Sequence, residues 1–260
     1  MNPLRTVQAL RYVLPLREGG SLPALIECDD LGTYVVKFRG AGQGPKVLVA
    51  EIVVGELARA VGLPVPDLVL VELDPELAFG EPDQEVQDLL RASAGLNLGM
   101  DYLPGSITLD PTVDAIDPDL AARVVWLDAL VDDVDRTWRN PNLLLWHGRP
   151  WLIDHGAALW WQHTWRAREA AVTRELRDGE QHVLLPVAGD LTLADAALAP
   201  MVTRELLTAV VGLAPAAWVH DPAVFDGVEQ SRTAYVELLL ARLAARSLWL
   251  APLEAARAAR

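Results

Sequence analysis

The sequence predicts an α+β fold built from two lobes, and three observations support this prediction. Strand-like patterns are crowded into the first 105 residues, whereas helical patterns dominate the rest of the 260-residue chain. Hydrophobic residues make up 52% of the chain, which is enough for a sizeable core. The character of the sequence changes after Gly105. We therefore expect an N-terminal lobe at residues 1–105, with an antiparallel sheet, a helix and a hinge, and a mainly helical C-terminal lobe at residues 106–260.

The N-terminal elements follow from local patterns. Extended runs at residues 24–28 and 33–38 are joined by a turn containing Asp29, Asp30 and Gly32, which is typical of a hairpin with a longer loop. A glycine-rich loop comes next, at residues 40–44. Helical spacing then covers residues 47–61 and ends at a glycine followed by two prolines. The remaining patterns predict a buried strand at residues 68–73, a helix at 81–93 and a short strand at 98–103.

The C-terminal elements begin with a strong helix signal. Asp117 followed by Pro118 is an N-cap with proline at the first helical position. An apolar face then recurs at steps of three and four, at Leu120, Val124, Leu127, Val131 and Val134. Two short apolar strands, at 143–146 and 151–153, predict a hairpin, and helical patterns cover residues 166–177, 191–197, 200–211 and 226–245. Four aspartates lie at the end of the first of these helices, and we expect three of them to form a solvated face: Asp128, Asp132, Asp133 and Asp135.

Composition and charge argue against several classes of function. The chain carries 22 basic and 36 acidic residues, a net charge of −14, which disfavours binding to nucleic acid or to a membrane surface. The single cysteine, Cys28, rules out an internal disulfide framework and a zinc site with several cysteines, and it fits a reducing compartment. Neither a secretory signal nor a long apolar run is recognisable, so we expect a cytoplasmic protein.

The predicted hairpin brings polar residues together at its open end. If the turn is centred on His147 and Gly148, then Ile153 faces Asn142; one more residue in the loop would place Asp154 opposite Asn142. In either register an amide and a carboxylate meet there. Asp135 lies just upstream, after the end of the long helix.

This set of residues is the one that phosphoryl transfer requires. One carboxylate orients the attacking hydroxyl, while an asparagine carbonyl and a second aspartate hold Mg²⁺ against the nucleotide phosphates. The order Asp-x₄-Asn, hairpin, Asp-x-Gly is that of protein kinases, and it assigns Asp135 as catalytic and Asp154 to the metal. Spacing favours Asn140 as the second metal ligand, and Asn142 remains an alternative. An ordinary polar hairpin with turn-forming residues is the competing interpretation.

Two charged residues in the N-terminal half fit the same chemistry. Lys37 lies inside an apolar strand, where a charge needs a partner, and Glu51 lies on the apolar face of the next helix. We therefore expect Lys37 to bind nucleotide phosphates and Glu51 to hold it. Glu56 is expected to be solvated. The alternative for Lys37 is an edge-strand lysine that reaches solvent.

Two glycine-rich segments are candidates for contact with phosphates. The first contains Gly19 and Gly20, and the second contains Gly42 and Gly44. Neither has the spacing of a Walker or Rossmann loop, but backbone amides of such loops can still bind anions. Plain flexible turns are the alternative for both.

Taken together, these segments resemble the HipA-like kinases. The resemblance covers the chain from about Leu22 to Leu159 and rests on the lysine strand with its glycine-rich loop, the helix leading to residues 62–66, Tyr102-Leu103-Pro104-Gly105, Asp135-Arg136 with Asn140-Pro141-Asn142, and Ile153-Asp154-His155-Gly156. It implies a protein-kinase-like fold that binds ATP between two lobes, with Lys37 on the phosphates, Asp135 catalytic, and Asn140 or Asn142 with Asp154 on Mg²⁺. It also implies that residues 99–105, including Met100 and Tyr102, form the hinge that meets adenine.

The sequence departs from that family at several points. His155 replaces the phenylalanine of the usual Asp-Phe-Gly, and Arg136 follows the catalytic aspartate instead of preceding it. The additional N-terminal region of full-length HipA proteins has no counterpart here, so an antitoxin partner is not carried over. No Ala-Pro-Glu segment follows Asp154.

The function expected from the sequence is Mg²⁺- and ATP-dependent transfer of the γ-phosphate to a hydroxyl, with a serine or threonine of a protein as acceptor. The alternatives are a kinase-fold module that acts through protein contacts, a kinase for a small-molecule or lipid hydroxyl, and transfer of AMP instead of phosphate. Six of the nine tryptophans fall within residues 138–165, and they form either a core or an aromatic patch that holds a peptide.

Overall fold

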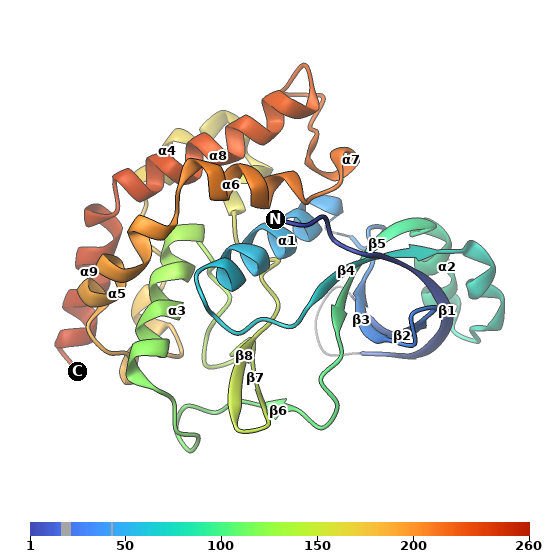
Figure 1. Cartoon of the computed structure of the whole chain (residues 1–260), viewed down its shortest axis with the longest axis horizontal. Coiled ribbons are helices and arrows are strands. Elements are labelled where there is room, and N and C mark those ends of the chain that lie inside the picture. The colour runs from blue at the N-terminus through green and yellow to red at the C-terminus, as the bar shows by residue number, and fades with distance from the viewer. Residues whose placement is uncertain (17–21, 43) are drawn as a thin grey trace. The chain divides into compact units, whose positions relative to one another are not determined.

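The computed structural model describes residues 1–16, 22–42 and 44–260 (Figure 1). Gly19 and Gly20 therefore lie outside the described residues. Contacts divide the chain into two compact units: unit 1 contains residues Met1–Val49 and Pro66–Pro104, and unit 2 contains residues Ala50–Val65 and Gly105–Arg260. The two lobes expected at 1–105 and 106–260 differ from these units, because residues 50–65 and Gly105 group with unit 2.

Unit 1 is a small barrel. Among the described residues, five strands close it in the order β1-β2-β3-β5-β4. Their bounds are Thr6–Pro15 for β1, Ala24–Cys28 for β2, Thr33–Lys37 for β3, Leu68–Leu73 for β4 and Gly95–Asp101 for β5. Neighbouring strands are antiparallel except β1 and β4, which pair in parallel and so close the barrel. Closure leaves fewer unpaired strand edges.

The strand β1 and the 3-10 helix at Pro75–Gly80 are elements of unit 1 that sequence patterns did not predict. The buried side chains of β1, such as Val7 and Ala9, are confined to its first half, and most of the second half is exposed. A strand that contacts the core over only part of its length shows no sustained alternation. The predicted strands at 24–28, 33–38 and 68–73 are confirmed.

One end of the barrel is covered by a 3-10 helix, Pro75–Gly80, and by α2, Gln84–Ala92. Ala78 and Leu90 from these elements join the barrel core around Ile26, Val36 and Val71. The helix predicted at 81–93 begins later, at Gln84, because the Asp83 carboxylate caps it by accepting a hydrogen bond from the Glu85 amide.

Unit 2 is built around the helix α3, Pro118–Val131, which begins at the predicted N-cap Asp117. It contacts α5 (Leu191–Leu198), α8 (Val228–Ala244) and α9 (Ser247–Ala258), and Figure 1 shows α5 and α9 on one side of it. The further helices are α1 (Pro45–Ala60), which begins in unit 1, α4 (Glu169–Thr173), α6 (Arg204–Gly212) and α7 (Ala216–Val219).

Two expectations for this unit are wrong. Asp128, Asp132 and Asp133 do not form a solvated face: all three are buried, because α3 is enclosed on nearly every side. The helix expected at 166–177 is reduced to α4, since the carbonyls of Ala171 and Arg174 accept hydrogen bonds from the buried Arg242 side chain instead of continuing the helix.

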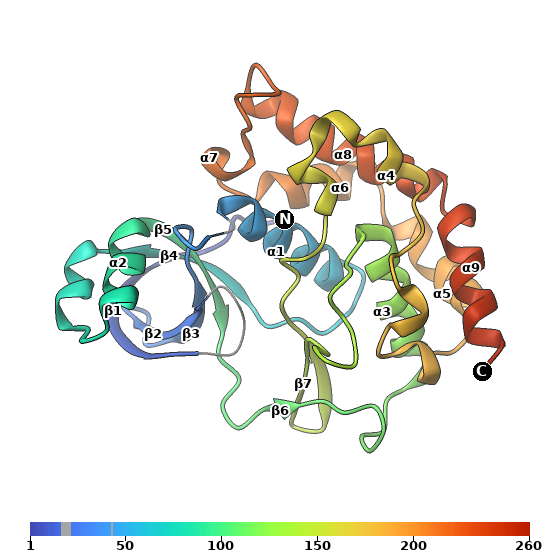
Figure 2. The same cartoon turned by 180° about the vertical axis from the view of Figure 1, so that it is seen from behind.

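A small sheet completes unit 2, in the order β6-β7-β8. Its strands are β6 (Ile107–Thr108), β7 (Leu143–Trp146) and β8 (Arg149–Leu152), and Figure 2 shows β6 beside β7 from the back. Leu143 pairs with Leu152 and Trp146 with Arg149, so the turn is centred on His147 and Gly148 and the first of the two predicted registers is confirmed.

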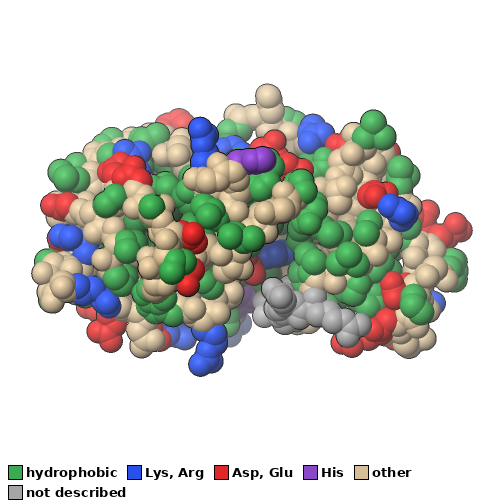
Figure 3. All heavy atoms as spheres, turned by 90° about the horizontal axis from the view of Figure 1, so that it is seen from below, with side chains coloured by type: hydrophobic (Ala, Val, Ile, Leu, Met, Phe, Trp, Pro, Cys, Tyr) green, Lys and Arg blue, Asp and Glu red, His purple; other side chains and the backbone are tan. Residues whose placement is uncertain are grey.

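Two surface observations accompany the fold. None of the described helices has the length and apolar character needed to cross a membrane. On the face drawn in Figure 3, the Lys and Arg side chains of the described residues are scattered among acidic and neutral ones.

Candidate functional site

The open end of the β7–β8 hairpin places Asn142 and Asp154 close to each other along neighbouring segments. The Ile153 amide donates to the Asn142 carbonyl at 3.1 Å, one step beyond the last strand pair. Both Asn142 (φ 50°) and Asp154 (φ 56°) have left-handed backbone conformations, which asparagine and aspartate tolerate better than other side chains. Two such residues at a strand end indicate a locally strained site.

The loop before β7 holds Asp135 and Asn140 together. The side-chain nitrogen Nδ2 of Asn140 donates a hydrogen bond to the Asp135 carboxylate at 2.8 Å. The side-chain nitrogen of Asn142 donates to the backbone carbonyl of Asp135 at 3.5 Å. Thr137 and Asn140 exchange two backbone hydrogen bonds, of 3.0 and 3.1 Å, which fold the loop back on itself. The structure therefore brings three predicted residues of unit 2 together, Asp135, Asn140 and Asn142.

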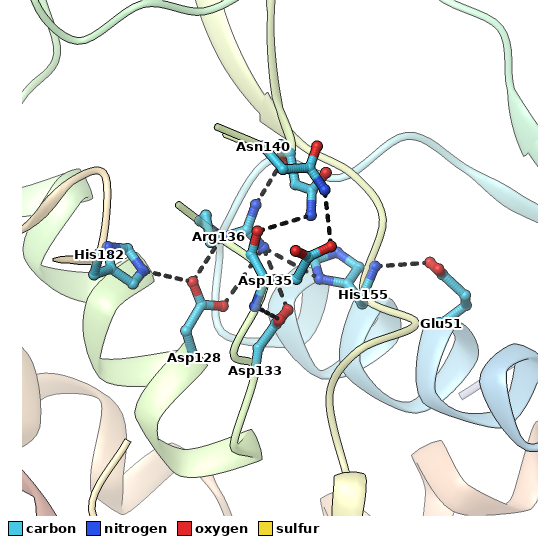
Figure 4. Close-up of polar contacts among 9 residues, drawn as sticks. Glu51, Asp128, Asp133, Asp135, Arg136, Asn140, His155 and His182 are labelled. Atoms are coloured by element: carbon cyan, nitrogen blue, oxygen red, sulfur yellow. Dashed lines mark hydrogen bonds and ion pairs between the residues drawn. The ribbon is translucent and has the colours of Figure 1, made fainter. Parts of the chain in front are cut away.

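Arg136 is the buried centre of this site (Figure 4). Its guanidinium donates to the Asp128 carboxylate at 2.6 Å and to the Asn142 carbonyl at 2.5 Å, and it lies 3.4 Å from Nδ1 of His155. A rigid, forked donor of this kind can fix several segments at once. Arg136 therefore links α3, the loop that carries Asp135, and the segment after β8.

A second buried contact comes from His182, late in the chain. Nδ1 of His182 accepts a hydrogen bond from the Leu184 amide at 3.1 Å, so the ring proton is on Nε2, which donates to Asp128 at 2.9 Å. The backbone of this segment also contacts the loop: His182 forms a bridge with Thr137, and the Val183 amide donates to the Arg136 carbonyl at 3.2 Å. His182 thus supports the loop from behind.

The buried aspartates Asp128 and Asp133 have pKa values shifted in opposite directions. Burial alone would raise the pKa of Asp128, but Arg136 and His182 outweigh it and hold that pKa below its ordinary value. Burial and the neighbouring Asp128 raise the pKa of Asp133 to about 8, despite Arg136. The Asp133 carboxyl accepts one hydrogen bond, from the Asp135 amide at 3.1 Å, and its other oxygen has no hydrogen-bond partner. Asp133 therefore carries a proton at neutral pH.

Glu51 fastens the segment that contains Asp154. It is buried on α1, and its carboxylate accepts a hydrogen bond from the His155 amide at 3.0 Å. Lys37 belongs to unit 1 and Glu51 to unit 2, so their predicted pairing stays a prediction. The expectation that Glu56 is solvated is wrong: it is buried in the same helix and pairs with Arg59 at 3.4 Å, which shields its charge.

Within unit 1, strand register places two predicted nucleotide-binding residues on one face. Val36 and Phe38 point into the barrel, so Lys37 points outward. Lys37 pairs with Leu98 and Val35 pairs with Met100, which puts Met100 on the same outer face. Tyr102 is the first residue after β5, and its backbone amide donates to the Thr33 carbonyl at 3.0 Å.

The second glycine-rich loop connects β3 to α1. Gly44 has φ +70°, and a Cβ atom at either Gly42 or Gly44 would meet no described atom within 4 Å. The surroundings of both glycines are therefore open. Their predicted contact with phosphates stays a prediction.

The oxygen atoms of Asp154, Asn140 and Asn142 fit a divalent metal ion that takes its remaining ligands from a bound substrate. The described residues contain no cluster of three His, Cys, Asp or Glu side chains that could hold a metal alone. Asp154, Asn140 and Asn142 offer only oxygen ligands, which suit Mg²⁺ when substrate phosphates supply further oxygens. Burial alone would lower the pKa of Arg136. The nearby carboxylates of Asp128, Asp133 and Asp154 outweigh burial and raise that pKa above its ordinary value.

Sequence reasoning missed Asp128 and His182. A signal for Asp128 existed, because it lies four residues after Val124 and three before Val131, on the apolar face of α3. No signal in the sequence connects His182 with residues more than forty positions earlier.

Comparisons with known proteins identify a family and a fold. The model of the family described as HipA-like kinase matches residues 11–251. Among solved structures, the Helicobacter pylori proinflammatory kinase CtkA is similar with a TM-score of 0.54 at 11% identity, covering 98% of this chain and 99% of that one. A Golgi casein kinase with Mn and ADP bound has a TM-score of 0.47 at 12% identity, covering 98% of this chain and 73% of that one. No match was found among curated proteins. The likeness to CtkA shows the fold, and the predicted α+β, protein-kinase-like fold is confirmed.

Proposed function

Because the chain belongs to the HipA-like kinase family, we propose that it is an ATP- and Mg²⁺-dependent phosphotransferase that moves the γ-phosphate to a serine or threonine hydroxyl of a protein. The observation that carries the proposal is the hydrogen bond between Asp135 and Asn140, formed beside the hairpin end that bears Asp154. These are the residue types, in the order along the chain, that phosphoryl transfer uses.

Each residue of the site has a role in this proposal. Asp135 accepts the proton of the attacking hydroxyl, and its hydrogen bond to Asn140 keeps the carboxylate in one orientation. Asp154 and one asparagine, Asn140 or Asn142, hold Mg²⁺, which neutralises charge on the nucleotide phosphates when bound. Arg136, Asp128 and His182 hold the loop in place without touching the reacting atoms.

Unit 1 contributes the remaining proposed contacts. Lys37 binds phosphates, Met100 and Tyr102 lie along the adenine, and Gly42 and Gly44 leave space for anions. Glu51 holds the segment after Asp154 through the His155 amide.

The proposal is tested by incubating the purified chain with ATP, Mg²⁺ and a mixture of serine and threonine peptides, and by measuring product masses. We expect the mass of a phosphoryl group to be added to peptides or to the chain itself. Asp135→Asn should slow transfer by roughly 10²- to 10⁴-fold, the usual contribution of a general base. Asp178→Asn is the control, because Asp178 is exposed on unit 2 and the chemical change is the same.

Three results would contradict the proposal in different ways. Addition of AMP would indicate adenylyl transfer, and transfer only to small-molecule hydroxyls would move the acceptor to another class. No transfer, with ATP still bound, would favour a kinase-fold binding module.

A further inference from the structure

The loop that carries Asp135 ends in a tight two-residue turn. Thr137 and Asn140 exchange backbone hydrogen bonds in both directions, so Trp138 and Arg139 form the tip between them. The side chain of Asn140, at the base of this turn, is bonded to the Asp135 carboxylate. The tip is therefore held at a fixed place beside the proposed general base.

Both residues of the tip are exposed. Trp138 is 48% exposed, whereas Trp161 and Trp165, in the same tryptophan-rich region, are buried and pack against each other and against Tyr235. Arg139 is exposed, and within the described part of the chain it forms no hydrogen bond or ion pair. In a chain with net charge −14, an arginine without an acidic partner beside a catalytic loop is a local positive site.

The chemistry of the two side chains defines what they would bind. An exposed tryptophan offers a large, rigid apolar surface, and tryptophan and arginine are the residues most often responsible for binding energy at protein interfaces. A guanidinium recognises carboxylate with two parallel hydrogen bonds. The pair is thus complementary to a segment that carries one apolar and one acidic side chain.

The position of the tip determines how far the acidic and apolar side chains of a bound polypeptide can lie from its acceptor hydroxyl. A hydroxyl that transfers its proton to Asp135 must approach within about 3 Å of the carboxylate. An extended polypeptide advances about 3.3 Å per residue, so residues up to three positions from the acceptor hydroxyl reach about 10 Å along the chain. This is the range over which side chains flanking the hydroxyl would meet a turn that begins two residues after Asp135.

We propose that Trp138 and Arg139 form an acceptor-recognition site, specific for a polypeptide that has an acidic residue and an apolar or aromatic residue within three positions of its serine or threonine. This inference rests on the proposed phosphotransferase function and names the class of its substrate. In it, Trp138 and Arg139 determine specificity, and Asp135 performs the chemistry.

The experiment measures kcat and KM for a set of serine peptides that differ only in the flanking residues: acidic, basic, apolar or alanine. For the unmodified protein we expect the acidic, apolar-containing peptide to have a KM about tenfold below that of the alanine peptide. Arg139→Glu should invert the charge preference, so that the basic peptide becomes the better acceptor. Trp138→Ala should raise KM for the apolar peptide about tenfold, and Trp138→Phe should restore most of that loss.

Arg149→Glu is the matched control. Arg149 is exposed on the same unit and forms no ion pair among the described residues, but it lies at the turn end of the β7–β8 hairpin. This variant should leave the peptide preference unchanged. Nucleotide affinity, measured by calorimetry, should be the same in all four variants.

The outcomes separate this inference from the proposed function. Transfer to peptides with equal KM for all flanking residues, or a charge preference that survives Arg139→Glu, would overturn the recognition site and leave the phosphotransferase intact. A loss of nucleotide affinity in Arg139→Glu would place Arg139 on the nucleotide and overturn the inference too. Absence of transfer to any peptide or protein would contradict the proposed function itself, and the recognition site with it.

Discussion

Arg136, Asp128 and Asp133 are packed together behind the loop that carries Asp135. Arg136 is charged, and Asp128 is ionised beside it. Asp133 keeps its proton at neutral pH. The positive charge of Arg136 is therefore matched by the negative charge of Asp128, which limits the cost of burying the pair.

The protonated Asp133 predicts a specific dependence of stability on pH. Its pKa is about 8 in the folded protein, against an ordinary value of 3.8. Between these values the folded state holds a proton that the unfolded state has lost, so this group's contribution to stability falls as pH rises, by about 1.4 kcal/mol per pH unit. Asp133→Asn removes this dependence, and the variant should gain about 2–3 kcal/mol relative to wild type between pH 6 and pH 8.

Urea unfolding at pH 6, 7, 8 and 9 measures this difference. The control is Asp178→Asn, whose offset from wild type should be constant over the same range, because Asp178 is exposed. An offset for Asp133→Asn that is equally constant would show that Asp133 is ionised in the folded protein.

At the scale of elements, the C-terminal end of α3 depends on one buried arginine of α8. Arg242 donates to the carbonyls of Leu130 at 2.8 Å and Ala129 at 2.5 Å, and also to those of Ala171 and Arg174. Burial lowers the pKa of Arg242 to about 10, which leaves it charged at neutral pH. It thus satisfies carbonyls at a helix end that have no partner within the helix.

Replacing this arginine should be among the most damaging changes in unit 2. Arg242→Met keeps a long side chain but removes every donor, so at least two buried carbonyls lose their partners, each at about 1–3 kcal/mol. We expect the free energy of unfolding in urea to fall by about 3 kcal/mol or more. Arg246→Met, which removes a partly exposed ion pair with Asp195, should cost less than about 1 kcal/mol. Equal losses in the two variants would contradict the capping role.

The elements that local patterns predicted are those whose ends are set by local chemistry. The start of α3 at Asp117 and the hairpin register centred on His147 and Gly148 both follow from residues adjacent in sequence. The strand β1 could not be predicted, because only half of it contacts the core. The early end of the helix α4 depends on Arg242, almost seventy residues later in the chain.

The residues of the candidate site also differ in whether the local sequence could predict them. Spacing predicted Asp135, Asn140 and Asp154 as candidate site residues, and the structure brings Asp135 and Asn140 within hydrogen-bond distance. The burial of Asp128 and the support from His182 depend on how distant segments pack, so spacing alone could not reveal them.

At the scale of the whole molecule, the residues proposed to act on the nucleotide come from both compact units. Lys37 and Met100 belong to unit 1, and Asp135 and Asp154 belong to unit 2. The chain contains only two lysines, and Lys37 is the one within a strand. Nucleotide binding is therefore expected to depend on substitutions made in either unit.

Lys37→Met tests the contribution of unit 1. Lys37 lies on the outer face of the barrel, so a methionine of similar length should leave the thermal unfolding midpoint within a few degrees of wild type. Phosphoryl transfer should nevertheless be abolished, because the charge that binds the phosphates is lost. Arg11→Met, which removes an exposed charge paired with Glu27 on the same unit, should retain full activity. Full activity in Lys37→Met would remove Lys37 from the site.

The most direct measurement is a calorimetric titration of ATP, with and without Mg²⁺, into wild type and Asp154→Asn. Asparagine tolerates the left-handed backbone at this position, so the variant changes the ligand and not the fold, and Asp178→Asn is a control with the same backbone conformation. Our account predicts magnesium-dependent binding that weakens at least tenfold in Asp154→Asn and is unchanged in Asp178→Asn. Equal affinity for ATP with and without Mg²⁺, or in all three proteins, would contradict it.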